Sequence, residues 1–238
     1  KISLEKAAKT LGETHILLIW SYFTCGFQFR RSDDSKAVDF INKGLVLLSE
    51  NVREDDVNII RMYAELGNFY FGKKDYEKAK EYLSKALEIE IKQFGEKHYH
   101  SAHKYYQLGL ICEKEGNADK ALEFLKKSIK IYKQTYGIEH DLICKLLTRV
   151  GRIYLSLSDK EEASKYLRES AELVSEIRGP NHTKTARALF ELGVLYDEWG
   201  NGGLAELLYL QVEGILETKK DELLMEHLCR ALGDLYRR

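Results

Sequence analysis

Apolar residues recur along the chain at the three-and-four spacing that places them on one face of an α-helix. Helix-length segments with this spacing follow one another in pairs, and short polar turns separate them. The pattern predicts helix pairs at about 15–31 and 35–50, 56–72 and 76–94, 98–115 and 118–136, 140–157 and 160–178, and 182–199 and 202–218, followed by a last helix at 221–238.

The pairs belong to a sequence repeat in which the same residue types return every 42 residues. Self-similarity at one fixed period indicates an array whose units bury their apolar faces against their neighbours. The sequence therefore predicts an all-α solenoid of tandem antiparallel helix pairs. The recurring positions are Gly67, Gly109, Gly151 and Gly193; Ala79, Ala121, Ala163 and Ala205; and Asp75, Asn117, Asp159 and Asn201.

We expect one continuous array rather than separate globular domains. The chain starts inside a repeat and opens with lysine, so we interpret it as a segment of a longer protein. The predicted units are 1–13, the end of a preceding repeat; five repeats at 14–53, 54–95, 96–137, 138–179 and 180–220; and 221–238, the first helix of a sixth repeat or a cap.

Two recurring positions have a direct structural interpretation. Glycine in the middle of a helix costs about 1 kcal/mol relative to alanine, so its return at one helical position predicts a close backbone contact. Gly67 is expected to face the region of Ala79 in its own second helix. The Asp or Asn before each second helix is expected to cap it by accepting a hydrogen bond from a first-turn amide.

Composition narrows the class of partner and the cellular setting. The formal charge is -1, so the chain lacks the general basic field that favours nucleic acid or anionic membranes. The longest apolar run, Ile16 to Trp20, is too short to insert into a membrane. We therefore expect a cytoplasmic protein. Four scattered cysteines without a Cys-x-x-Cys spacing are interpreted as small buried side chains.

No motif indicates catalysis. The chain contains no glycine-rich phosphate loop, nucleophile elbow or His-Glu-x-x-His sequence. His98, His100 and His103 are the closest group of possible metal ligands, but His98 and His100 point to different sides of a helix. We predict that the chain is not an enzyme and that it uses no cofactor or metal.

The motif Leu66-Gly67-x-x-Tyr70, followed by Ala79 and Leu83, resembles the tetratricopeptide repeat over essentially the whole chain. The 42-residue period and a Gly-x-x-His sequence between units, as at Gly95 to His98, are similar to the kinesin-light-chain and nephrocystin-type subgroup. This resemblance implies a right-handed superhelix in which the first helices line a concave groove.

The groove positions of that family, carried over to this sequence, form a basic row beside an aromatic one. Such a surface suits a peptide or partner helix with acidic and bulky apolar residues, because cations bind carboxylates and aromatic rings supply buried area. The candidate residues are Trp20, Phe23, Phe27, Arg61, Asn68, His103, Tyr106, Gln107, Lys145, Arg149, Arg152, Arg187 and Phe190.

Several functions remain open at this point. The asparagine ladder of kinesin light chains is missing, and the carboxylate clamp of chaperone-binding members is matched at Asn68, Lys145 and Arg149 but not at Ala64 or Gln107. The main hypothesis is a protein-interaction scaffold or adaptor. The alternatives are a ligand-sensing regulatory segment of a larger signalling or catalytic protein, and an architectural assembly subunit.

Overall fold

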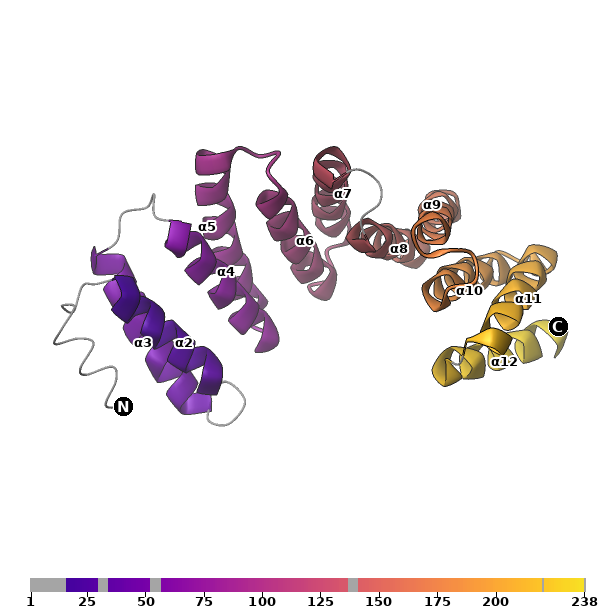
Figure 1. The fold of residues 1–238 in the computed structure, drawn as a ribbon, viewed down its shortest axis with the longest axis horizontal. Helices are drawn as coiled ribbons and strands as arrows, with labels where there is room; N and C mark the ends of the chain where they lie inside the picture. The colour runs from indigo at the N-terminus through magenta and orange to yellow at the C-terminus, as the bar shows by residue number, and fades with distance from the viewer. Residues whose placement is uncertain (1–15, 30–33, 52–56, 137–140, 220, 238) are drawn as a thin grey trace. The chain divides into compact units, whose positions relative to one another are not determined.

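The computed structural model describes residues 16–29, 34–51, 57–136, 141–219 and 221–237, and each regular element in these ranges is an α-helix (Figure 1). The all-α prediction is confirmed. The predicted end of a preceding repeat, residues 1–13, lies outside the described residues, as do His15 and His140. The helices are α2 (Ile16–Phe29), α3 (Asp34–Asn51), α4 (Val57–Gly72), α5 (Tyr76–Phe94), α6 (Tyr99–Lys114), α7 (Ala118–Tyr136), α8 (Asp141–Ser156), α9 (Lys160–Arg178), α10 (Thr183–Glu198), α11 (Gly202–Thr218) and α12 (Glu222–Arg237).

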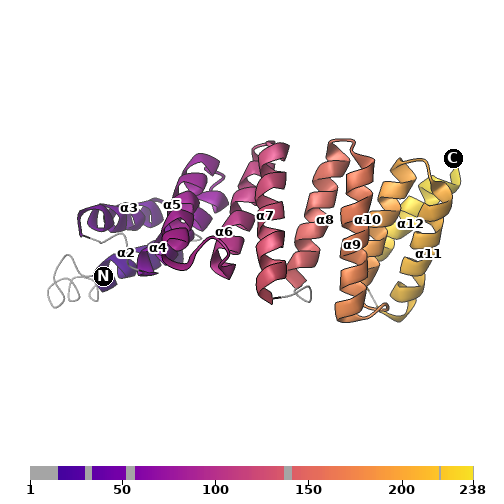
Figure 2. The same ribbon diagram turned by 90° about the horizontal axis from the view of Figure 1, so that it is seen from above.

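The chain divides into two compact units, residues 1–96 and 97–238. In the first unit, α2 packs on α3 and α4 packs on α5. In the second unit, the pairs are α6 with α7, α8 with α9, and α10 with α11, and α12 packs on both members of the last pair. Successive helices of the second unit lie side by side (Figure 2). No described helix is long and apolar enough to cross a membrane.

The core of each unit is built from the apolar faces that the sequence pattern predicts. In the first unit, Ile19, Met62 and Leu66 are fully buried. In the second unit, Leu195 and Tyr209 are buried in a cluster that α9, α10, α11 and α12 share. Within each unit, neighbouring helices therefore bury their apolar faces against one another, as expected for a repeat array.

The recurring glycines bring the two helices of each pair into close contact. A Cβ atom at Gly67 would lie 2.5 Å from Cγ of Leu83 and 3.3 Å from the carbonyl oxygen of Ala79, so the predicted contact is confirmed. Real Cβ atoms essentially never approach other atoms so closely, and a larger side chain would force the helices apart. The equivalent shortest distances are 2.8 Å to Leu125 at Gly109, 2.7 Å to Leu167 at Gly151 and 2.6 Å to Tyr209 at Gly193.

The predicted N-caps are also confirmed. A side-chain oxygen of Asp75 accepts a hydrogen bond from the Lys78 amide at 3.2 Å. Equivalent bonds at the next three second helices join Asn117 to the Lys120 amide at 3.2 Å, Asp159 to the Glu162 amide at 3.2 Å and Asn201 to the Leu204 amide at 3.4 Å. Each cap satisfies a first-turn amide that has no partner within its own helix.

The cysteine prediction holds for two of the four side chains. Cys112 and Cys144 are buried, and Cys25 is partly buried. The prediction is wrong for Cys229, which is exposed. Cys229 lies on α12, and α12 buries Leu224 and Leu228 rather than the side that carries the cysteine.

The residue before each of these four N-caps occupies the left-handed backbone region. Gly116 and Gly200 have φ angles of 77° and 81°, and at the same place in the other two turns Lys74 and Ser158 both have a φ angle of 62°. A residue with a Cβ atom pays roughly 1 kcal/mol for this conformation, whereas glycine does not.

We expect Ser158→Gly to raise the free energy of unfolding by up to about 1 kcal/mol, because glycine adopts the left-handed conformation without strain. The gain is reduced by the larger conformational entropy that glycine gives the unfolded chain. The matched control is Gly116→Ser, which should lower the stability. Thermal unfolding followed by circular dichroism measures both variants. A Ser158→Gly protein that melts below the natural chain would contradict this account of the turn.

Candidate functional site

The candidate groove residues lie in two units. Those in the first unit are Trp20, Phe23, Phe27, Arg61 and Asn68, and those in the second are His103, Tyr106, Gln107, Lys145, Arg149, Arg152, Arg187 and Phe190. Each unit brings some of its candidates together around a cavity.

In the first unit, Trp20, Phe27 and Arg61 line a cavity of about 320 Å³ between α2 and α4. The Arg61 guanidinium carbon lies 4.8 Å from the centre of the Trp20 ring, which is the geometry of a cation–π contact. Asn68 is exposed on α4 and does not line this cavity. The first unit thus offers a small cationic and aromatic pocket.

The groove position predicted for Phe23 is wrong. This side chain is fully buried, and its ring comes within 3.0 Å of where a Cβ atom would stand at Gly44. Gly44 in α3 therefore leaves room for the ring to turn into the core. Phe23 stacks on Phe27, with ring centres 6.3 Å apart, and so supports the pocket from inside.

The second unit has two neighbouring cavities on its first helices, and Lys145 and Thr148 of α8 line both of them. One has a volume of about 720 Å³ and lies between α6 and α8, and the other has a volume of about 260 Å³ and lies between α8, α9 and α10. The first is also lined by Tyr106, Glu113, Lys114, Arg149, Arg152, Ile153 and Ser156, and the second by Cys144, Ser170, Val174, Lys184, Arg187, Ala188 and Glu191. We call this surface the α6–α8–α10 face.

A family model described as the tetratricopeptide repeat matches residues 58–134, 100–176 and 141–218, which together span more than half of the chain. The chain belongs to the tetratricopeptide repeat family. The comparison with curated proteins gave no match.

Solved structures of tetratricopeptide repeat proteins share the fold at low sequence identity. Kinesin-light-chain TPR-like repeats from Podosopora anserina match with a TM-score of 0.72 at 18% identity, over 85% of this chain and 97% of that one. The apo form of RapI matches with a TM-score of 0.72 at 20% identity, over 88% and 74%. YrrB, a TPR protein with an unusual peptide-binding site, matches with a TM-score of 0.59 at 19% identity, over 95% and 97%.

Three arginines of this tetratricopeptide repeat chain have carboxylate partners on neighbouring first helices. Arg149 of α8 donates a hydrogen bond to Glu113 of α6 at 2.6 Å. Arg152 of α8 lies 3.6 Å from Glu191 of α10. These pairs cross from one repeat to the next and partly neutralise the basic row that the sequence suggests.

The third pair joins α10 to the start of α12. Two nitrogens of Arg187 donate to the same oxygen of Asp221, at 2.7 and 3.0 Å. The hydrogen bond from Arg187 lowers the pKa of Asp221. Lys145 differs from the three arginines, because it is exposed and has no ion-pair partner among the described residues. Lys114 is also exposed and also has no ion-pair partner among the described residues, but it lines only the larger cavity, whereas Lys145 lines both.

Three predicted residues of the second unit contribute less to the face than the repeat alignment suggests. Phe190 is partly buried and packs against Tyr209, with ring centres 5.7 Å apart. Gln107 is half-buried on α6 and lines neither cavity. His103 is partly exposed, and its Nδ1 atom lies 3.5 Å from the Tyr132 hydroxyl. His103 also lines neither cavity.

Seven polar residues that line the two cavities are not among the candidates predicted from the sequence: Glu113, Lys114, Thr148, Ser156, Ser170, Lys184 and Glu191. Thr148 stands at a groove position of the repeat, and its short hydroxyl side chain gave no signal beside the charged and aromatic candidates. Lys114 and Lys184 lie near the ends of their helices, away from the positions carried over from the family. Only the packing of neighbouring helices brings them to the cavities.

The surroundings of His103 predict that the stability of the fold depends on pH. Loss of contact with water, and then the positive charge of Lys104, lower the pKa of His103 below its ordinary value of 6.5. The pKa of His100 is lowered by the same two causes in the same order. Below pH 6.5 the unfolded chain therefore binds protons that the folded chain does not, so stability falls as the pH falls from 6.5 towards the folded-state pKa.

We expect the thermal midpoint to drop between about pH 7 and about pH 5, and to drop less in His103→Gln, because glutamine does not titrate. His227→Gln, at an exposed position on α12, is the matched control. Melting curves at several pH values measure the effect. An equal drop in His103→Gln and in the natural chain would contradict the assignment to His103.

Proposed function

We propose that this tetratricopeptide repeat protein binds an acidic peptide or partner helix on the α6–α8–α10 face. Repeats of this family are in general scaffolds for protein interaction and not enzymes. The observation that carries the proposal is the position of Lys145, which is exposed, has no ion-pair partner among the described residues, and lines both cavities. A carboxylate of a bound peptide can reach this ammonium group from either cavity.

The charges around Lys145 favour an acidic ligand. In the larger cavity, Lys114, Lys145, Arg149 and Arg152 outnumber the one carboxylate, Glu113. In the smaller cavity, Lys145, Lys184 and Arg187 outnumber Glu191. Charge-assisted hydrogen bonds to carboxylates are about twice as strong as neutral ones, so acidic side chains would supply most of the specificity.

Bulky apolar residues of the ligand would bind beside these charges. The ring of Tyr106 lies at the edge of the larger cavity, together with Ile153. Arg61 and Trp20 give the first unit a smaller pocket of the same chemistry. Of the three positions matched to a chaperone-type carboxylate clamp, Lys145 and Arg149 share one cavity, whereas Asn68 lies in the other unit.

The proposal is for binding without catalysis, by an adaptor in the cytoplasm. The solved structure of YrrB, described by its peptide-binding site, supports a peptide as the class of ligand. The ligand proposed here is defined by its chemistry, namely carboxylates that alternate with aromatic or large aliphatic side chains.

The test is a capture experiment from cytosolic extract with the natural chain and with Lys145→Glu, read by mass spectrometry. We expect acidic partners to be lost from Lys145→Glu, because replacing one cation by a carboxylate in a charged contact costs about 1.5–3 kcal/mol or more, which is tenfold or more in affinity.

The matched control is Lys130→Glu, the same change at an exposed lysine of α7 that lines neither cavity. Partners that leave Lys145→Glu and remain on Lys130→Glu support the α6–α8–α10 face. Identical partner sets from both variants and the natural chain would overturn the proposal.

A further inference from the structure

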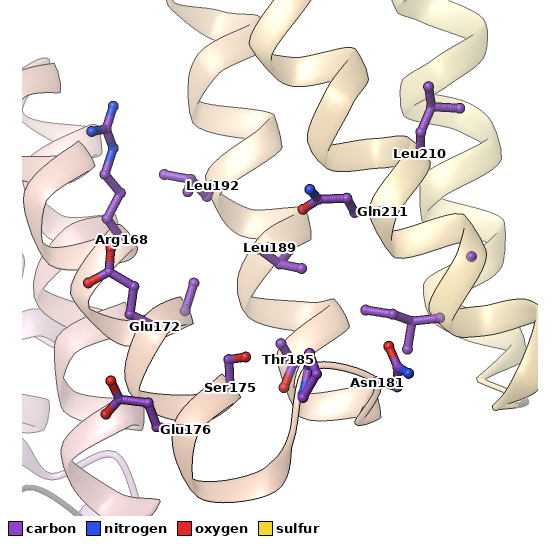
Figure 3. Close-up of a pocket in the computed structure, with 14 residues that line it drawn as sticks. Arg168, Glu172, Ser175, Glu176, Asn181, Thr185, Leu189, Leu192, Leu210 and Gln211 are labelled. Atoms are coloured by element: carbon purple, nitrogen blue, oxygen red, sulfur yellow. The ribbon is translucent and has the colours of Figure 1, made fainter.

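A further cavity of the second unit shares no lining residue with the two cavities of the α6–α8–α10 face. It has a volume of about 740 Å³ and lies between α9 and α11, with α10 as its floor. Figure 3 shows Glu172 and Glu176 on the α9 side, Leu189 and Leu192 on α10, and Leu210 on the α11 side. We call this cavity the α9–α11 groove.

The outer face of α11, of which Leu210, Gln211 and Gly214 line the groove, is unusually apolar for a second helix. Leu207 and Leu210 are 54% and 47% exposed, and Leu204 is exposed beside them. The exposed positions of this face are Gly203, Leu204, Leu207, Leu210, Gln211, Gly214, Glu217 and Thr218, and the first six of them carry no charge.

The other repeats provide an internal comparison for these six positions. One period earlier, α9 has Glu161, Glu162, Lys165, Arg168, Glu169 and Glu172, and two periods earlier α7 has Asp119, Lys120, Glu123, Lys126, Lys127 and Lys130. Every one of these residues is charged. At these positions α7 and α9 therefore present charged side chains, whereas α11 presents leucine, glycine and one glutamine.

The two glycines of this face are not explained by packing inside the chain. A Cβ atom at Gly203 or Gly214 would meet no heavy atom within 4 Å. Glycine inside a helix costs about 1 kcal/mol relative to alanine, and Gly214 stands well inside α11. Exposed glycine allows another backbone to approach the helix closely, which a contact with a second molecule would use.

The charges of the rim indicate the chemistry of that molecule. Glu172 and Glu176 are exposed, one helical turn apart, and have no ion-pair partner among the described residues. Arg168 lies at the end of the groove, where its Nε donates to the Tyr196 hydroxyl at 2.6 Å. One rim is therefore acidic, the other is uncharged and apolar, and the floor is formed by leucine side chains.

We propose that the α9–α11 groove binds an amphipathic helix of a partner protein, with apolar residues on one side and lysine or arginine along one edge. Its apolar side packs on Leu189, Leu192 and Leu210, as in other helix-in-groove complexes. Its basic edge faces Glu172 and Glu176. This partner has the opposite charge from the ligand of the α6–α8–α10 face, so the second unit can hold two different partners at once.

The probes are two fluorescent helical peptides with the same Leu and Ala side, one with lysines along its edge and one with glutamates there. Anisotropy titrations against the full chain measure both affinities. We expect the lysine peptide to bind at least about tenfold more tightly than the glutamate peptide, the difference produced by one or two charged contacts.

Two variants locate the binding. Leu210→Arg, which restores the residue type of α9, should weaken the lysine peptide about tenfold or more. Glu172→Lys combined with Glu176→Lys should reverse the preference between the two peptides. Leu157→Lys is the matched control, because Leu157 is 47% exposed, as Leu210 is, and lies outside the groove.

Three results would overturn the proposal. The first is no binding of the lysine peptide, and the second is binding that Leu210→Arg leaves unchanged. The third is a dimer of the full chain, seen by sedimentation, that Leu210→Arg dissociates, since the groove would then be a contact between two copies. A correct circular dichroism spectrum of each variant shows that the fold is retained.

Discussion

Every described helix pair depends on one close approach, between a glycine of the first helix and a large apolar side chain of the second. The distances from an added Cβ atom at Gly67, Gly109 and Gly151 to the facing leucine are between 2.5 and 2.8 Å, so no other residue fits without movement. In the α10–α11 pair the facing residue is Tyr209 rather than leucine. This contact fixes how the helices of a pair lie against each other, and the α6–α8–α10 face and the α9–α11 groove both depend on it.

Much of the fold could be predicted from the sequence because its determinants are local and repeated. The apolar spacing predicts each helix, Asp75 and its equivalents mark where the second helices begin, and the glycines mark the close contacts. Each of these signals returns every 42 residues, so a repeat in which one position departs from the pattern is still identified from the equivalent positions of the other repeats. Lys74 and Ser158 show the limit of this reasoning, since they adopt the left-handed backbone that only glycine would have indicated.

The candidate site could be predicted only in part, because its properties come from contacts between helices. The repeat alignment identifies Arg149 and Arg187, but it does not identify their partners, Glu113 of α6 and Asp221 just before α12. Lys145 is without an ion-pair partner among the described residues and lines both cavities. Phe23 stands at a groove position, yet the space beside Gly44 takes it into the core. The α9–α11 groove has a signal in the sequence, because six positions of α11 that are charged in α7 and α9 are uncharged here. The structure shows that some of these positions line a cavity with α9 and α10.

The most direct test of this account is the thermal unfolding of Gly109→Leu beside Gly214→Leu, since these change the same residue type to the same side chain in helices of one unit. A Cβ atom at Gly109 would lie 2.8 Å from Leu125, whereas at Gly214 it would meet no heavy atom within 4 Å. We expect Gly109→Leu to lose the cooperative helical transition, because overpacking a tight contact costs about 1–3 kcal/mol or more. We expect Gly214→Leu to melt at or above the melting temperature of the natural chain, because leucine favours a helix more than glycine does. Equal melting of the two variants would contradict the role given to the glycine contact.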